Sequence, residues 1–207
     1  TPVHRQRHFG GGKGTNAAGL PNPPGNNWRP ARSNYIYNRG TRNNHQRQND
    51  PHGPMKWNCE LGIRDCSDGT SNTFIIGERD TLFCRSAAWV GMRNPCGNGS
   101  RGYFYVLSHS RAPLNAPDPP LAWGGNDGCG EGFSSLHGTG AQFLFCDGSV
   151  RMLNENIGYD ETCKQRGGAN RCPWHRWTPG DPRFDHLGVY QRLSRRNDGF
   201  QLDASSF

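Results

Sequence analysis

The chain has 207 residues, a formal net charge of +7 and eight cysteines, and Leu, Ile, Val and Phe make up only about 15% of it. That composition is typical of disordered chains, but 22 aromatic residues and the cysteines can supply a core and cross-links, so we expect a loop-rich, disulfide-stapled domain in an oxidising compartment. No apolar run approaches the roughly 18 residues of a membrane helix, and the absence of any CxxC pair argues against zinc ribbons, iron–sulfur sites and thioredoxin-like motifs.

Residues 1–49 hold all of the excess positive charge. They contain eight Lys or Arg residues and no Asp or Glu, whereas the other 158 residues hold 16 basic and 17 acidic side chains. Their Gly, Asn and Pro content predicts an arm, followed by a single β-rich domain over residues 50–207. The arm could dock on a neighbouring copy or a cell-surface polyanion, or wrap on its own domain; nucleic acid is not expected, because no recognition motif is present. The proposed assembly residues are Arg5, Arg7, Lys13, Arg29, Arg32, Arg39, Arg42 and Arg47.

Strand patterns begin at the end of this arm. Residues 33–38 alternate, with Tyr35 and Tyr37 on one face of the expected strand. Prolines and glycines further along predict a long irregular loop. The other expected elements of this part are strands at 82–92 and 102–108 and the loop at 112–132.

Residues 65–78 (DCSDGTSNTFIIGE) predict a polar turn that leads into a strand at 73–76. Asp68 can accept hydrogen bonds from amides two or three residues ahead of it, as turn-forming carboxylates do. The same residues also make calcium a candidate cofactor, since oxygen donors lie close together in the sequence. The candidate ligands are Asp65, Asp68, Asn72 and Asp147.

Residues 133–157 contain the clearest hairpin signal. Two short apolar segments flank Asp147-Gly148, a dipeptide that suits a type I′ turn. The period of two then assigns side chains to faces. We expect Phe143 and Phe145 on one face with Val150 and Met152 across from them, and Gln142, Leu144 and Cys146 on the other.

A helix is predicted at 187–196, where Leu187, Tyr190 and Leu193 form a short apolar stripe. Asp185 is the expected N-cap, and Asn-Asp-Gly at 197–199 the expected end.

Eight cysteines allow 105 disulfide pairings, so the sequence does not determine the connectivity. Pairing of near neighbours is the simplest expectation. It joins Cys59 to Cys66, Cys84 to Cys96, Cys129 to Cys146 and Cys163 to Cys172.

Two further constellations have a functional and a structural interpretation. Trp123, Trp174 and Trp177 could form an aromatic platform for a sugar, or fill space under a loop. Ser134, Ser135, His137 and Asp147 invite a hydrolase interpretation, but no Gly-x-Ser-x-Gly elbow is present, and His137 more simply holds a turn or joins Asp147 at a metal. We therefore assign no catalytic residue.

Four ordered motifs resemble the planctomycete-type, prepilin-type processing-associated H-x9-DG domain, a family of pilin-like proteins of uncharacterised function. They are SNYIYNRG at 33–40, DGTSNT-x-x-x-GE at 68–78, His137 followed after nine residues by Asp147-Gly148, and GVYQRLSRRNDG at 188–199. The motif residues are His137, Asp147, Gly148, Asp68, Gly69, Asn72 and Glu78. The family's N-terminal hydrophobic helix has no counterpart in this sequence, so we expect that a precursor segment or a separate chain supplies it.

The resemblance implies an α+β fold like a pilin head, with an antiparallel sheet and long loops. It also implies a non-enzymatic extracellular subunit that assembles with identical copies into a surface filament, pilus-like fibre or sheath. The alternative is a secreted module that binds carbohydrate or another cell-envelope polymer.

Overall fold

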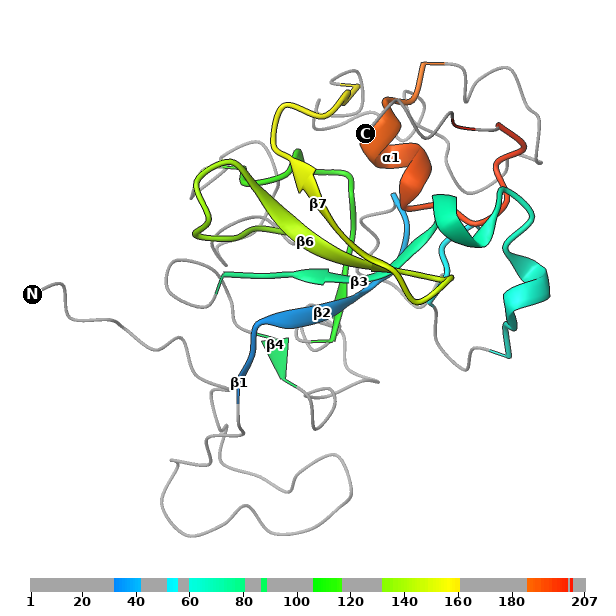
Figure 1. Cartoon of the computed structure of the whole chain (residues 1–207), viewed down its shortest axis with the longest axis horizontal. Helices are drawn as coiled ribbons and strands as arrows, with labels where there is room; N and C mark the ends of the chain where they lie inside the picture. The colour runs from blue at the N-terminus through cyan, green and yellow to red at the C-terminus, as the bar shows by residue number, and fades with distance from the viewer. Residues whose placement is uncertain are drawn as a thin grey trace, which may run out of the picture.

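The computed structural model describes residues 32–41, 52–55, 60–80, 87–88, 106–116, 132–160, 186–200 and 202. Within them lie a five-stranded sheet, a two-stranded sheet, two 3₁₀ turns and one short helix (Figure 1). The elements are β1 (Arg32–Ser33), β2 (Tyr35–Asn38), η1 (Ile63–Asp65), η2 (Thr70–Asn72), β3 (Phe74–Glu78), β4 (Ala87–Ala88), β5 (Leu107–Ser108), β6 (Gly140–Phe145), β7 (Val150–Asn154) and α1 (Val189–Leu193).

The larger sheet has the strand order β5-β2-β3-β6-β7, and β1 pairs with β4 separately. Only the contact between β2 and β5 is parallel; the other neighbours are antiparallel. The predicted strand at 33–38 is present as β2, with Ser33 in β1, and Tyr35 and Tyr37 share a face as expected. The structure shows that this face is exposed. A mixed sheet with little helix agrees with an α+β or mostly-β fold. Among the described residues, no helix is long and apolar enough to cross a membrane.

The predicted hairpin exists, but its turn is one residue longer than the Asp-Gly signal suggests. Phe145 donates its amide to the Ser149 carbonyl at 2.9 Å, and Leu144 pairs with Val150. The loop therefore contains three residues, and its last, Gly148, has a φ of 85°. This is the three-residue hairpin loop with a glycine in the left-handed region, not a type I′ turn.

The longer turn reverses the predicted faces of the second strand. A shift of one residue in register moves every side chain to the opposite face. Val150 and Met152 are exposed, whereas Leu153 is buried with Phe143 and Phe145. The expectation that Val150 and Met152 face the two phenylalanines was therefore wrong.

The core lies on the face of the sheet that carries Phe143 and Phe145. Phe74 of β3 is fully buried, and its ring lies within 6.3 Å, centroid to centroid, of four other aromatic rings. One of these belongs to Tyr190 of α1, so the helix packs on this face. The core residues are Ile36, Phe74, Leu114, Phe133, Ala141, Phe143, Phe145, Leu153, Tyr190 and Leu193.

The helix is shorter than predicted, although its apolar stripe is confirmed. Leu187, Tyr190 and Leu193 are buried, but α1 spans only Val189–Leu193. Gly188 is the N-cap, and its amide donates to Gln191 Oε1 at 3.0 Å. The expected cap, Asp185, lies outside the described residues.

Candidate functional site

The motif residues lie at separate places in the fold, and each holds a neighbouring segment in place. Glu78, at the end of β3, is buried, and its Oε2 accepts the Gln142 amide at 2.8 Å. Its Oε1 lies 3.3 Å from His137 Nε2, and the His137 side chain is half exposed. The histidine and the glutamate of the two motifs therefore join the loop before β6 to the middle of the sheet.

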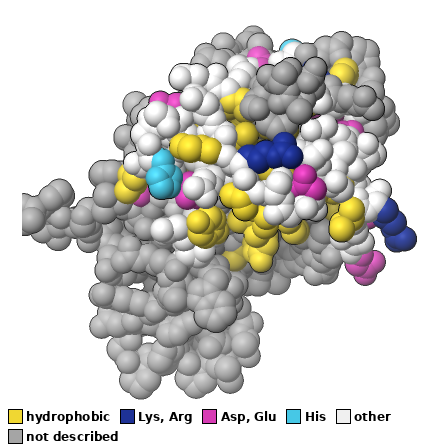
Figure 2. All heavy atoms as spheres, in the orientation of Figure 1, with side chains coloured by type: hydrophobic (Ala, Val, Ile, Leu, Met, Phe, Trp, Pro, Cys, Tyr) yellow, Lys and Arg dark blue, Asp and Glu magenta, His cyan; other side chains and the backbone are white. Residues whose placement is uncertain are grey.

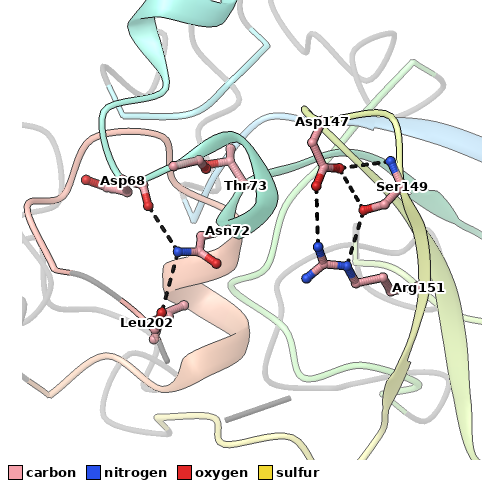
Figure 3. A network of polar contacts seen from close by, with 8 residues as sticks. Asp68, Asn72, Thr73, Asp147, Ser149, Arg151 and Leu202 are labelled. Atoms are coloured by element: carbon pink, nitrogen blue, oxygen red, sulfur yellow. Dashed lines mark hydrogen bonds and ion pairs between the residues drawn. The ribbon is translucent and has the colours of Figure 1, made fainter. Parts of the chain in front are cut away.

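Asp68 is the anchor of the C-terminal segment. Its carboxylate accepts the Asp198 amide at 2.6 Å and the Gly199 amide at 3.1 Å. Asn72 supports the same region, since its Nδ2 donates to the Asp68 carbonyl at 3.2 Å and to the Leu202 carbonyl at 3.5 Å (Figure 3). The DGTSNT turn thus binds backbone from residues about 130 positions further along the chain.

Asp147 stabilises its own turn. Its Oδ1 accepts the Ser149 amide at 2.8 Å and the Ser149 hydroxyl at 2.6 Å. Arg151 Nη2 lies 3.4 Å from its Oδ2. The hydrogen bonds from Ser149, and after them the charge of Arg151, hold the pKa of Asp147 below its usual value.

The four candidate calcium ligands do not converge. Figure 3 shows Asp147 turned toward Ser149 and Arg151, away from the Asp68 and Asn72 pair. Asp65 Oδ2 accepts the Gly62 amide at 2.7 Å. Within the described ranges, no group of three or more His, Cys, Asp or Glu side chains could hold a metal ion. The described residues therefore give no support to a calcium site.

The hydrolase constellation is also dispersed. His137 precedes β6 and Asp147 follows it, so a six-residue strand, roughly 20 Å long, separates them. Ser134 Oγ accepts the Asp80 amide at 3.1 Å, and the Ser135 hydroxyl donates to the Gly140 carbonyl. These contacts are those of turns, and they bring no serine, histidine and aspartate together as a triad.

Sequence reasoning did not single out Asn38, although it lies in the SNYIYNRG motif. Its side chain is fully buried, and Nδ2 donates to the Phe74 carbonyl at 2.8 Å and to the Ser194 carbonyl at 3.0 Å. Its Oδ1 accepts the Gly40 amide at 2.8 Å. One amide group therefore connects β2, β3 and the end of α1. The available signal was a polar residue two positions after Ile36, on the face of the alternating strand opposite the two tyrosines.

The structure brings together two cysteines that we had assigned to other partners. The Sγ atoms of Cys66 and Cys146 lie 3.4 Å apart, and both are free thiols. Cys59 and Cys129, their predicted partners, lie outside the described residues, as do the other four cysteines. No disulfide is present in the part of the chain that the structure describes.

Most of the predicted assembly arm and the aromatic platform cannot be placed. Arg5, Arg7, Lys13, Arg29, Arg42, Arg47 and the three tryptophans lie outside the described residues, so these predictions stay open. Residues 32–41, which the predicted boundary assigns to the arm, instead supply β1 and β2. Arg39 is buried there, and its amide donates to the Ser108 carbonyl at 2.8 Å.

The ionisation of Asp198 makes the stability of the fold depend on pH. Its Oδ1 accepts the Phe200 amide at 2.9 Å, but its Oδ2 is buried without a hydrogen-bond partner. Burial, and after it the negative charge of Asp68, raise the pKa of Asp198 to about 6. Between about pH 4 and pH 6, the Asp198 carboxyl is therefore protonated in the folded chain but ionised in the unfolded chain. The contribution of Asp198 to the free energy of unfolding therefore falls as the pH rises from about 4 to about 6, and this penalty is complete above that range.

Replacement of Asp198 by Asn is expected to remove this penalty. Asparagine keeps the acceptor for Phe200 and can donate its amide group to Asp68. We expect a gain of about 2 kcal/mol in the free energy of unfolding at pH 7.5 and little change at pH 4. Urea unfolding at both pH values measures the effect, with Glu60→Gln at an exposed position as the control. A loss of stability at pH 7.5 in Asp198→Asn would contradict the assignment.

Comparison with known proteins identifies a family but no characterised relative. The family model described as "Protein of unknown function (DUF1559)" matches residues 10–160. No curated protein and no solved structure matches the chain significantly. The family match covers more than half of the chain and includes β2, β3 and the β6–β7 hairpin. The chain therefore belongs to the DUF1559 family of proteins of unknown function.

Proposed function

We propose that this chain is a non-enzymatic structural subunit, pilin-like in its sheet domain, whose copies assemble into an extracellular filament or sheath. The observation that carries the proposal is the apolar outer face of the sheet. Tyr37, Ile76, Leu144 and Val150 lie directly opposite one another across β2, β3, β6 and β7. Tyr35 and Met152 flank this row on the same face. We call these six residues the outer row.

The apolar side chains of the outer row are exposed to solvent in the single chain. The exposed fractions of Tyr35, Tyr37, Val150 and Met152 are 55, 48, 61 and 50%. Hydrophobic side chains gather over the sheet in the view of Figure 2. One face of an antiparallel sheet usually carries polar residues where it meets water, and a contiguous apolar patch commonly marks an interaction surface.

A second copy of the chain is the occupant that the charge distribution favours. Residues 1–31, which precede β1, carry four Lys or Arg residues and no Asp or Glu, whereas residues 50–207 hold 16 basic and 17 acidic side chains. The arm of one copy can therefore neutralise the body of the next. The two outer strands of the described sheet, β5 and β7, also differ in length and sequence. A contact between unlike edges is heterologous, and its repetition produces a fibre wherever the rotation between copies does not close a ring.

The motifs that resemble the prepilin-type H-x9-DG family support the same proposal. In the described residues their polar side chains make structural contacts: Asp68 binds the C-terminal backbone, and Glu78 holds the loop of His137. Contacts of this kind suit a rigid subunit. Export to an oxidising compartment remains part of the proposal and rests on the cysteine content.

Substitution of the outer row tests the proposal. Val150→Lys is expected to raise the concentration needed for fibre formation about tenfold or more, because it replaces a buried apolar contact by a charge in each interface. Pelleting assays and negative-stain images of the 207-residue chain measure the effect. Ile63→Lys is the matched control, since Ile63 is 70% exposed but lies on η1, away from the outer row.

Two results would contradict assembly through this face. One is a wild-type chain that stays monomeric in sedimentation velocity at every accessible concentration. The other is a Val150→Lys variant that forms fibres as readily as the wild type. A deletion that probes the arm should end at residue 31, because β1 begins at Arg32.

A further inference from the structure

Two thiols that are 80 residues apart in sequence face each other between the two turns that carry family motifs. Cys66 follows η1 and precedes the DGTSNT turn, and Cys146 is the first residue of the β6–β7 loop. Their Sγ atoms lie 3.4 Å apart. Both cysteines are partly buried, and their thiols contact each other.

The backbone holds the two cysteines in this position without help from sulfur. The Cys146 amide donates to the Thr73 carbonyl at 2.8 Å, and the Asp147 amide to the Thr70 carbonyl at 3.2 Å. On the other side, Cys66 donates its amide to Ile63 and accepts the Gly69 amide at 3.1 Å. The hairpin loop is therefore fixed against η2, and η2 against Cys66. The sulfur atoms need to approach by only about 1.4 Å to reach bonding distance.

We propose that Cys66 and Cys146 form a disulfide that locks the DGTSNT turn onto the β6–β7 hairpin. The oxidant is a second disulfide, either a small molecule or a dithiol oxidase. The Cys66 thiolate attacks one sulfur of that disulfide and releases the other as a thiolate. Cys146 then loses its proton and attacks Cys66, which releases the second thiolate. Two protein thiols become one disulfide, and the oxidant becomes two thiols.

The surroundings of the pair explain this order of attack. Burial, and after it the contact with Cys66, raise the pKa of the Cys146 thiol to about 12. Cys146 is therefore a poor first nucleophile at neutral pH, because the thiolate is the reactive form. Within the described ranges, no further His, Cys, Asp or Glu side chain joins the pair to form a metal site.

The bond would close a loop of about 80 residues, which contains all of β3 and β6. A cross-link over such a distance removes much of the freedom of the unfolded chain. It would also make the connection between the two turns depend on the redox state of the surroundings. This inference concerns the folding of one copy and does not depend on assembly.

Peptide mapping of the chain, refolded in a mixture of reduced and oxidised glutathione, tests the pairing directly. Trypsin leaves Cys66 on residues 65–79 but leaves Cys129 and Cys146 together on residues 112–151, because no Lys or Arg lies between them. A second cleavage after Glu131 separates those two cysteines. We expect a linked pair of peptides that carry Cys66 and Cys146. Linkage of Cys66 to Cys59, linkage of Cys146 to Cys129, or alkylation of both as free thiols would overturn the proposal.

The variants Cys66→Ser and Cys146→Ser give an independent readout. Each removes the same bond, so both variants and the double variant should lose about 10 °C in thermal midpoint under oxidising conditions, with no further loss in the double variant. The three variants and the wild type should converge when a reductant is present. Additive losses in the double variant would indicate two separate cysteine contacts and would overturn the disulfide.

Discussion

Phe74→Ala is expected to lower the free energy of unfolding by about 3–5 kcal/mol. The Phe74 side chain is fully buried, and its ring packs against Phe133, Phe143, Phe145 and Tyr190. These partners come from β6, from the segment before it and from α1, so the cavity lies where the sheet and the helix meet. Rings held in an aromatic cluster cannot collapse into that space without leaving their own contacts.

Chemical denaturation, monitored by circular dichroism, measures this loss. Met152→Ala is the matched control, because Met152 lies on the opposite, exposed face of the same sheet. We expect the control to change stability by less than about 0.5 kcal/mol. A Phe74→Ala variant that is as stable as the control would mean that the ring cluster is not the core of the domain.

The second large effect is expected at Asn38. Asn38→Leu keeps the volume of the side chain but removes three hydrogen bonds, so two carbonyls and one amide remain buried without their partner. Each such group costs about 1–3 kcal/mol, and we expect a total loss of about 3–5 kcal/mol. The loss should appear in the free energy of unfolding and in faster hydrogen exchange of the Gly40 amide.

Asn38→Asp separates the role of the donor from that of the acceptor. The aspartate retains an acceptor for Gly40, but its charged form faces the Phe74 and Ser194 carbonyls without a proton to donate. Folding must therefore raise the pKa of the introduced carboxyl. A raised pKa makes the folded state more stable as the pH falls, so the variant should recover part of its loss toward acidic pH relative to the wild type. A pH-independent loss would show that the two carbonyls do not face the side chain.

The outer row shows which side-chain positions follow from the local sequence pattern and which depend on the geometry of a turn. The alternation of residues 33–38 correctly predicted that Tyr35 and Tyr37 share a face, because the period of two is a property of any strand. The same reasoning failed for Val150 and Met152, since their face depends on the number of residues in the preceding loop. Asp-Gly favours a tight turn, but packing of Leu153 beside Phe143 selects the longer one.

The motif residues show a similar division. The sequence predicted that these residues form polar turns, and the structural interpretation of His137 agrees with its contact to Glu78. The sequence did not predict which residues they bind. Asp68 binds amides about 130 residues away, and Cys66 faces a cysteine 80 residues away. Near-neighbour pairing of cysteines ignores the sheet, which brings β3 beside β6 and so carries Cys146 to Cys66.

By itself, the sequence determined the local features of this protein: the position of the β6–β7 hairpin, the shared face of Tyr35 and Tyr37 on β2, and the apolar stripe of α1. These depend on side-chain periodicity and on turn-forming residues within a few positions of each other. Only the tertiary structure decided the strand order, the faces of β7, the three bonds of Asn38 and the approach of Cys66 to Cys146. Periodicity specifies which side of an element is buried, whereas the choice of partner is made when distant segments compete to bury the same aromatic core.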